Sequence, residues 1–222
     1  LGLYSVAFKL VLLPVGLLKN QIVNVLFPAF SSIQNDKIRL KRVVLTTVNA
    51  LGLVSIPTIF LVWLLIPAAI FCAMKPEWAG LSEVVRLLFV AFFFEMLQFP
   101  GAILLSQGLS QEYARIMISY RVVYFIGIVV GAILGGVTGL LYGMILANSV
   151  SFLPMIWYTG KFTGIAVKEY LKEIYPAFLV SVLALVLSTF ISGYLIPEQN
   201  LLLIISTIVV FLSVFVAVVG VM

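Results

Sequence analysis

Four ionisable side chains lie inside or close to long apolar segments of this 222-residue chain: Lys9, Lys19, Glu95 and Arg121. Even on a lenient scale, a charge at the centre of a bilayer costs about 2.5 kcal/mol, so each of these side chains requires a polar environment. Cations in a shielded cavity bind anionic groups such as phosphates, and a carboxylate there can take part in proton or sodium coupling. These residue types therefore predict a polar path through an apolar protein.

Glu95 lies near the middle of the apolar segment 81–105, where its side chain cannot easily reach the surface, and Gln98 shares its face of a helix. Two interpretations stay open for this carboxylate. It lines a cavity, or it forms an interhelical salt bridge with Arg121. Arg121 itself lies about 9 Å along a helix from Arg115, so its long side chain can instead extend to the headgroups.

Lys9 and Lys19 flank Pro14 and Gly16 in the first apolar segment. The proline and the glycine predict a kink or an unwound stretch, and broken helices of this kind line cavities in transporters. Two lysines beside such a break predict an anion-attracting wall. The alternative for Lys9 is a position near the external headgroups.

The composition requires a membrane. Hydrophobic residues make up 64% of the chain and charged residues 9%, whereas a soluble domain has about 25% charged residues. The chain has no histidine and one cysteine, which excludes internal disulfides, clustered His or Cys metal sites and catalysis by an imidazole base. We expect neither a cofactor nor a metal.

Gly, Pro, Asn and charged residues separate seven apolar segments. They cover about residues 1–33, 43–74, 81–105, 114–134, 137–158, 170–195 and 201–222. Unbroken apolar runs of about 20 residues predict spanning helices, because barrel strands alternate over about 10 residues. The sequence therefore predicts an all-α, polytopic membrane helix bundle that forms a single transmembrane domain over 1–222.

Small and polar residues predict how the helices pack. Close packing is expected around the turn between segments 114–134 and 137–158, where the glycines are Gly131, Gly135, Gly136, Gly139 and Gly143. Hydrogen bonds between helices are expected from Asn148, Ser149 and Ser151.

Basic residues fix the orientation of the bundle. Loops 34–42, 106–113 and 159–169 share one side of the membrane, and eight basic residues lie in or beside them: Lys37, Arg39, Lys41, Arg42, Arg115, Lys161, Lys168 and Lys172. The opposite side has two, Lys75 and Arg86. This bias places the first set in the cytoplasm. Because the charges sort by membrane side, the net charge of +5 does not require nucleic acid as a partner.

Two stretches carry a family resemblance. Residues 1–42, LGLYSVAFKLVLLPVGLLKNQIVNVLFPAFSSIQNDKIRLKR, contain a Leu-Pro pair, a Phe-Pro-x-Phe-Ser element and a basic turn. Residues 75–88, KPEWAGLSEVVRLL, resemble an external Gly-Pro-x-Trp turn, with Lys75 in place of the glycine. Together they resemble the Wzx-type polysaccharide flippases of the multidrug/oligosaccharidyl-lipid/polysaccharide exporter superfamily.

The resemblance implies that the seven segments are helices eight to fourteen of a 14-helix protein, its C-terminal lobe. Members of the family are thought to flip an undecaprenyl-diphosphate-linked oligosaccharide from the cytoplasmic to the periplasmic leaflet of the bacterial inner membrane by alternating access. The implied partners are this lipid-linked oligosaccharide, membrane lipids, the missing N-terminal lobe and a polysaccharide polymerase. The substrate would belong to lipopolysaccharide or exopolysaccharide synthesis, and the chain would not be an enzyme.

The resemblance also implies roles for the buried charges. In related lipid II flippases a basic residue faces the central cavity at the position of Lys9. Lys9 would then bind the substrate. From their positions in apolar segments, Lys19 and Arg121 are further candidate substrate-binding cations, and Glu95 with Gln98 is the candidate for coupling transport to an ion. The alternatives are a multidrug or metabolite exporter of the same superfamily, and a membrane polymerase or acyltransferase. The Phe-Pro-x-Phe-Ser element argues against the exporter, and the absence of histidine and of long external loops argues against the enzymes.

Overall fold

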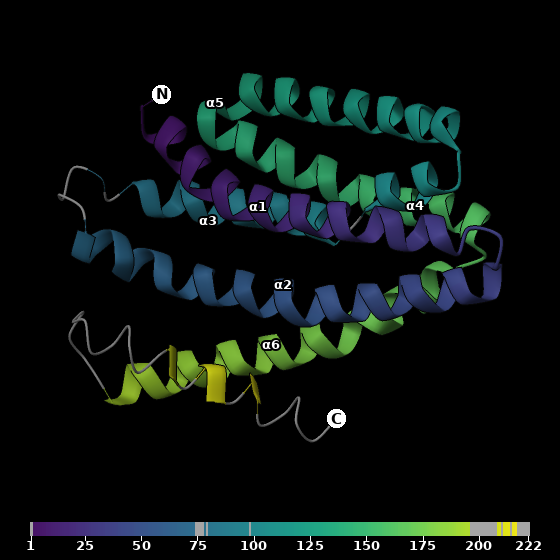
Figure 1. Ribbon diagram of the computed structural model, residues 1–222. Coiled ribbons are helices and arrows are strands. Elements are labelled where there is room, and N and C mark those ends of the chain that lie inside the picture. Colours follow the sequence, from purple (N-terminus) through teal and green to yellow (C-terminus); the bar gives the residue numbers. More distant parts are fainter. Residues whose placement is uncertain are drawn as a thin grey trace.

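The computed structural model describes residues 2–73, 78, 80–97, 99–195, 208–209, 211–213 and 215–216. Within the helices, this description leaves out the side chains of residues 3, 12–24, 67–68, 71–73, 96 and 191–195. Six helices follow one another: α1 (Gly2–Ser32), α2 (Lys37–Ala73), α3 (Leu81–Met96), α4 (Pro100–Ser106), α5 (Ser110–Thr163) and α6 (Val167–Leu195) (Figure 1). No strand occurs among the described residues, which confirms the all-α prediction.

Four described helical stretches are long and apolar enough to cross a membrane: Lys37–Ile66, Leu81–Ser106, Ser110–Thr163 and Val167–Phe190. The third is a 54-residue helix that folds back on itself, so its two arms correspond to the predicted segments 114–134 and 137–158. The predicted segment 201–222 lies mainly outside the described residues. The structure therefore supports a helical membrane protein and does not confirm the number of seven spans.

The α5 hairpin turns at two glycines. Gly136 has a φ of +59°, which a side chain would disfavour, and Gly135 also has non-helical backbone angles. Beyond the turn the two arms touch directly, because a Cβ on Gly131 or Gly143 would overlap a carbonyl oxygen of the facing arm. The predicted close packing is thus confirmed for Gly131, Gly139 and Gly143, whereas a Cβ on Gly135 or Gly136 would meet no atom within 4 Å.

The predicted segment 81–105 is broken, and this corrects the expectation of one continuous helix. α3 ends at Met96 and α4 begins at Pro100. Proline has no backbone N–H to donate to the carbonyl one turn earlier, and its ring disfavours a helical residue before it. The buried Tyr170 hydroxyl donates a hydrogen bond to the carbonyl of Leu97 within the break. A side chain of α6 therefore satisfies a backbone group that the broken helix leaves open.

A second proline is compensated in α2. Residue 67 is proline, so the carbonyl of Trp63 lacks its usual donor one turn later. The Arg86 side chain of α3 donates from Nε to this carbonyl at 3.2 Å, and its guanidinium carbon lies 5.3 Å from the centroid of the Trp63 ring. Arg86 thereby joins α3 to α2.

The first apolar segment differs from its prediction. α1 is helical from Gly2 to Ser32, through Pro14 and Gly16, so of the two predicted alternatives the unwound stretch is wrong, and the kink stays a prediction. In apolar surroundings each remaining backbone hydrogen bond is strongly favoured, and one missing N–H is tolerated within a helix.

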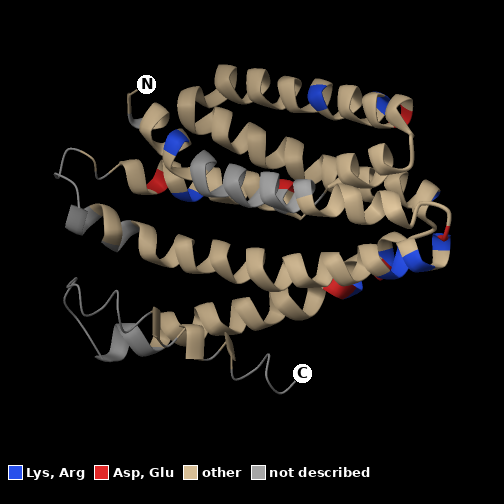
Figure 2. Cartoon of the chain, viewed as in Figure 1, with Lys and Arg blue, Asp and Glu red and all other residues tan. Residues whose placement is uncertain are grey.

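Helix neighbours define the bundle. α2 packs chiefly on α6, α3 packs on α1, α2 and α5, and α4 bridges α1 and α5. The links α1–α2, α4–α5 and α5–α6 lie at the same end of the bundle, on the right in Figure 1. Lys and Arg gather at this end in Figure 2, which is the end that loop charges assign to the cytoplasm.

Candidate functional site

A cavity of about 240 Å³ brings Glu95 and Arg121 together. Its walls come from α1, from both arms of α5 and from the region where α3 breaks into α4. The lining residues are Phe27, Glu95, Phe99, Pro100, Gly101, Ala102, Leu105, Tyr113, Met117, Tyr120, Arg121 and Met155. Two of the side chains that the sequence singled out thus share one partly polar space in an apolar bundle.

Glu95 is the penultimate residue of α3 and is half-buried. The carbonyl end of a helix carries partial negative charge, which disfavours a carboxylate there. Glu95 therefore depends on compensation from its surroundings, and Arg121 provides positive charge on the wall of the same cavity. The break that ends α3 also places the carboxylate beside irregular backbone, a feature common where transporters line a cavity.

Arg121 is exposed on the first arm of α5, and its guanidinium carbon lies 5.6 Å from the centroid of the Tyr120 ring. The Tyr120 and Tyr124 rings stack with their centroids 5.9 Å apart. A guanidinium beside aromatic faces offers several N–H donors to a phosphate or a hydroxyl group. The site can therefore bind an anionic or polyhydroxylated group.

A buried hydrogen-bond network holds the walls of the cavity in place. The Tyr120 hydroxyl donates to Asn148 Oδ1 at 2.7 Å, and Asn148 Nδ2 donates to the carbonyl of Ala91 in α3 at 2.6 Å. Asn148 is only 1% exposed. This network joins both arms of α5 to α3, so it fixes the segment that carries Arg121 relative to the segment that carries Glu95.

The network confirms the predicted interhelical hydrogen bonding for Asn148. For Ser149 the prediction is wrong, because its hydroxyl donates to the carbonyl of Ile145 in the same helix at 2.8 Å. Sequence reasoning missed Tyr120 as a site residue. Two features of the sequence could have identified it: Tyr120 is adjacent to Arg121, and it shares a helical face with Tyr124, four residues later.

The two arms of α5 are also joined at the end opposite the turn. Tyr158 on the second arm donates a hydrogen bond to the carboxylate of Glu112 on the first. The same carboxylate accepts from Arg115 at 2.8 Å. Tyr113, next to Glu112, lies against Gly101 of α4, where an added Cβ would come within 3.3 Å of the tyrosine ring. Large side chains thus join the two arms in the half of the hairpin that is far from its turn.

Of three further predicted site residues, one lies elsewhere on α1, and the side chains of the other two are outside the part of the chain that the structure describes. Lys9 is exposed on α1 and does not line the cavity. The Lys19 side chain and Gln98 lie outside the described part of the chain. Their roles stay predictions.

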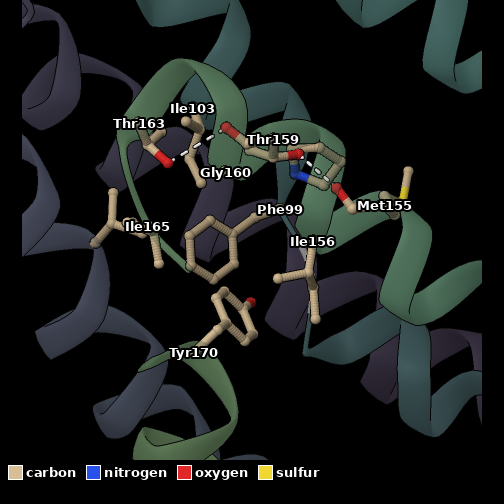
Figure 3. A pocket seen from close by; sticks show the side chains of 11 residues that line it. Phe99, Ile103, Met155, Ile156, Thr159, Gly160, Thr163, Ile165 and Tyr170 are labelled. Atoms are coloured by element: carbon tan, nitrogen blue, oxygen red, sulfur yellow. Dashed lines mark hydrogen bonds between the residues drawn. The ribbon is translucent and has the colours of Figure 1, made fainter. Parts of the chain in front are cut away.

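A second pocket, between α2, α4, α5 and α6, is shown in Figure 3. Its space for solvent is about 20 Å³, enough for about one water molecule. Its two threonine hydroxyls are already engaged, because Thr159 donates to the carbonyl of Met155 at 2.8 Å and Thr163 to that of Thr159 at 3.2 Å (Figure 3). This pocket is a small packing space and not a ligand site.

Comparison with known proteins adds one finding. Residues 1–83 match a family model described as polysaccharide biosynthesis protein. No curated protein and no solved structure shows a significant match to the chain. The matched residues comprise α1, α2 and the start of α3, and they include the stretch with the Phe-Pro-x-Phe-Ser element. The match supports a polysaccharide biosynthesis protein family and suggests a role in polysaccharide biosynthesis.

Proposed function

We propose that this chain is the C-terminal lobe of a Wzx-type flippase that moves an undecaprenyl-diphosphate-linked oligosaccharide from the cytoplasmic to the periplasmic leaflet of the inner membrane. The observation that carries the proposal is the match of residues 1–83 to polysaccharide biosynthesis proteins in a chain with long apolar helices. The cavity of Glu95 and Arg121 supports it, because a transported headgroup requires polar walls inside the membrane.

In this proposal Arg121 contacts the anionic or hydroxylated part of the substrate, and Lys9 and Lys19 add positive charge on α1. Cations bind a diphosphate strongly where little water competes, through charge-assisted hydrogen bonds. Glu95, with Gln98, takes up and releases the coupling ion. The lipid tail stays in the bilayer while this lobe moves against the N-terminal one.

The network of Tyr120, Asn148 and Ala91 supports a movement of whole lobes. It joins α3 and both arms of α5, so these elements move as one unit. Access to the cavity then changes at the boundary with the N-terminal lobe, as expected for alternating access by rocking.

The test uses cells that lack the gene and carry the full-length protein on a plasmid. Without the protein we expect loss of surface polysaccharide and accumulation of lipid-linked oligosaccharide in the inner membrane. Restoration of both by the wild type supports the flippase. Normal polysaccharide in the deletion strain contradicts it, and normal polysaccharide with increased drug sensitivity would favour the exporter.

Glu95→Gln tests the coupling carboxylate in the same cells. It keeps the shape of the side chain and removes the charge, so we expect lower export at matched protein levels. Glu83→Gln is the control, because Glu83 is exposed in the first turn of the same helix. Full export with Glu95→Gln would contradict a coupling role.

A further inference from the structure

The first turns of α2 and α6 lie side by side at the end of the bundle that the loop charges assign to the cytoplasm. Lys41 Nζ of α2 lies 2.7 Å from Glu169 Oε1 of α6, and Glu169 Oε2 accepts from the Ala166 backbone N–H at 2.9 Å. Two turns further along α2, Asn49 Nδ2 donates to the carbonyl of Glu173 at 3.2 Å. We call the surface along these contacts the α2–α6 seam.

The α2–α6 seam carries more positive than negative charge. Its six basic residues are Lys37, Arg39, Lys41, Arg42, Lys168 and Lys172, and its three acidic residues are Asp36, Glu169 and Glu173. All the basic side chains except Lys41 are exposed. Glu169 is engaged by Lys41, and Asp36 accepts from the backbone N–H of Arg39 at 2.9 Å. Within the described residues, none of the five exposed cations forms an ion pair.

Below these cations, the exposed faces of both helices become apolar. On α6, Lys168 and Lys172 are followed on the same face by Tyr175, which is 61% exposed, and Leu179, which is 39% exposed. On α2, about three turns beyond Arg42, Val54 is 57% exposed. Charge at the headgroup level with apolar side chains beneath it matches the profile of a phospholipid with an anionic headgroup.

We propose that the α2–α6 seam is a binding site for an anionic phospholipid of the cytoplasmic leaflet. Arg42 and Lys172 contact the phosphate on either side of the Lys41–Glu169 ion pair, and an acyl chain lies along Tyr175 and Leu179. Exposed apolar side chains are expected on any membrane-spanning helix, so the specific feature of the seam is its cluster of five exposed cations, none of which forms an ion pair within the described residues.

The experiment measures lipid selectivity of the purified full-length protein in vesicles of phosphatidylcholine with spin-labelled phosphatidylglycerol or spin-labelled phosphatidylcholine as the probe. The Arg42→Gln, Lys172→Gln double variant removes two cations of the seam. We expect its preference for the phosphatidylglycerol probe to fall by at most about fivefold for each cation removed. Each cation near an anionic surface contributes about that factor to lipid binding. Arg42→Lys with Lys172→Arg keeps the charges and should keep the preference.

The matched control is the Arg115→Gln, Lys161→Gln double variant, which removes the same charge from α5. Arg115 pairs with Glu112, and Lys161 Nζ lies 3.7 Å from the centroid of the Trp157 ring, so both are already engaged within α5. The proposal predicts near wild-type selectivity for this control. It is overturned if the seam variant keeps the wild-type preference, if the control loses as much, or if millimolar inorganic phosphate removes the preference. Lipid selectivity requires no transport, so this result is independent of the flippase assay.

Discussion

In the two halves of the α5 hairpin, opposite kinds of residue join one arm to the other. Near the turn, glycine faces glycine: an added Cβ on Gly127 would lie 2.8 Å from the carbonyl oxygen of Gly143. In the other half, Tyr120 on one arm reaches Asn148 on the other through a buried hydrogen bond, and the cavity with Arg121 opens beside it. Glycines bring the backbones into contact, whereas large polar side chains keep space that a ligand can enter.

The largest expected effect comes from breaking the glycine contact. A methyl group on Gly143 would overlap the carbonyl of Gly127, which is backbone and cannot rotate away. We expect Gly143→Ala to lower the free energy of unfolding by about 3 kcal/mol, at the upper end for overpacking. The measurement is thermal unfolding of the purified protein in detergent, together with its yield.

Gly135→Ala is the control for this variant. Gly135 lies in the turn of the same hairpin, has a negative φ, and an added Cβ there meets no atom within 4 Å. It should unfold close to the wild type. Equal destabilisation by both substitutions would mean that helix propensity or turn geometry, and not contact between the arms, sets the role of these glycines.

The second expected effect comes from the polar half of the hairpin. Asn148→Ala leaves the Tyr120 hydroxyl and the Ala91 carbonyl without their partner in a buried position, which costs about 1–3 kcal/mol. Ser149→Ala removes a hydroxyl that bonds only within its own helix, so it should change stability little. The same thermal unfolding assay compares them. A neutral Asn148→Ala would show that the network does not hold the arms together.

Much of this fold follows from residue types. Apolar runs predict the helices, and the pair Gly135 and Gly136 marks the turn of the hairpin, because only glycine adopts the positive φ of Gly136 at no cost. The effect of proline was harder to predict. The helix is interrupted before Pro100, where α3 ends at Met96 and α4 begins at Pro100, whereas α1 passes through Pro14. The difference depends on tertiary partners: Tyr170, some 70 positions later in the sequence, donates to a carbonyl in the break before Pro100.

The candidate site could also be predicted in part from residue types. Charges stand out in an apolar sequence, so Glu95 and Arg121 could be named, and the structure places both on one cavity. Tyr120 carries no charge and does not stand out by residue type, so it was missed, and only its position next to Arg121 and on the helical face of Tyr124 pointed to it. The pairing of Tyr120 with Asn148 depends on how the hairpin closes, which the glycines determine about three turns away.

The smallest expected effect on stability, and the one that separates binding from packing, is that of Arg121→Gln. Arg121 is exposed and contacts the Tyr120 ring, so its loss should cost less than about 1 kcal/mol of folding free energy. If it binds substrate, export should nevertheless fall about tenfold or more, because a charge-assisted hydrogen bond contributes about 1.5–3 kcal/mol. Arg115→Gln, which removes a charge from the same helix at an exposed ion pair, should change neither quantity by much. If Arg121→Gln instead destabilises the protein as much as Asn148→Ala, the arginine is a structural partner of Glu95, and both halves of the hairpin serve packing alone.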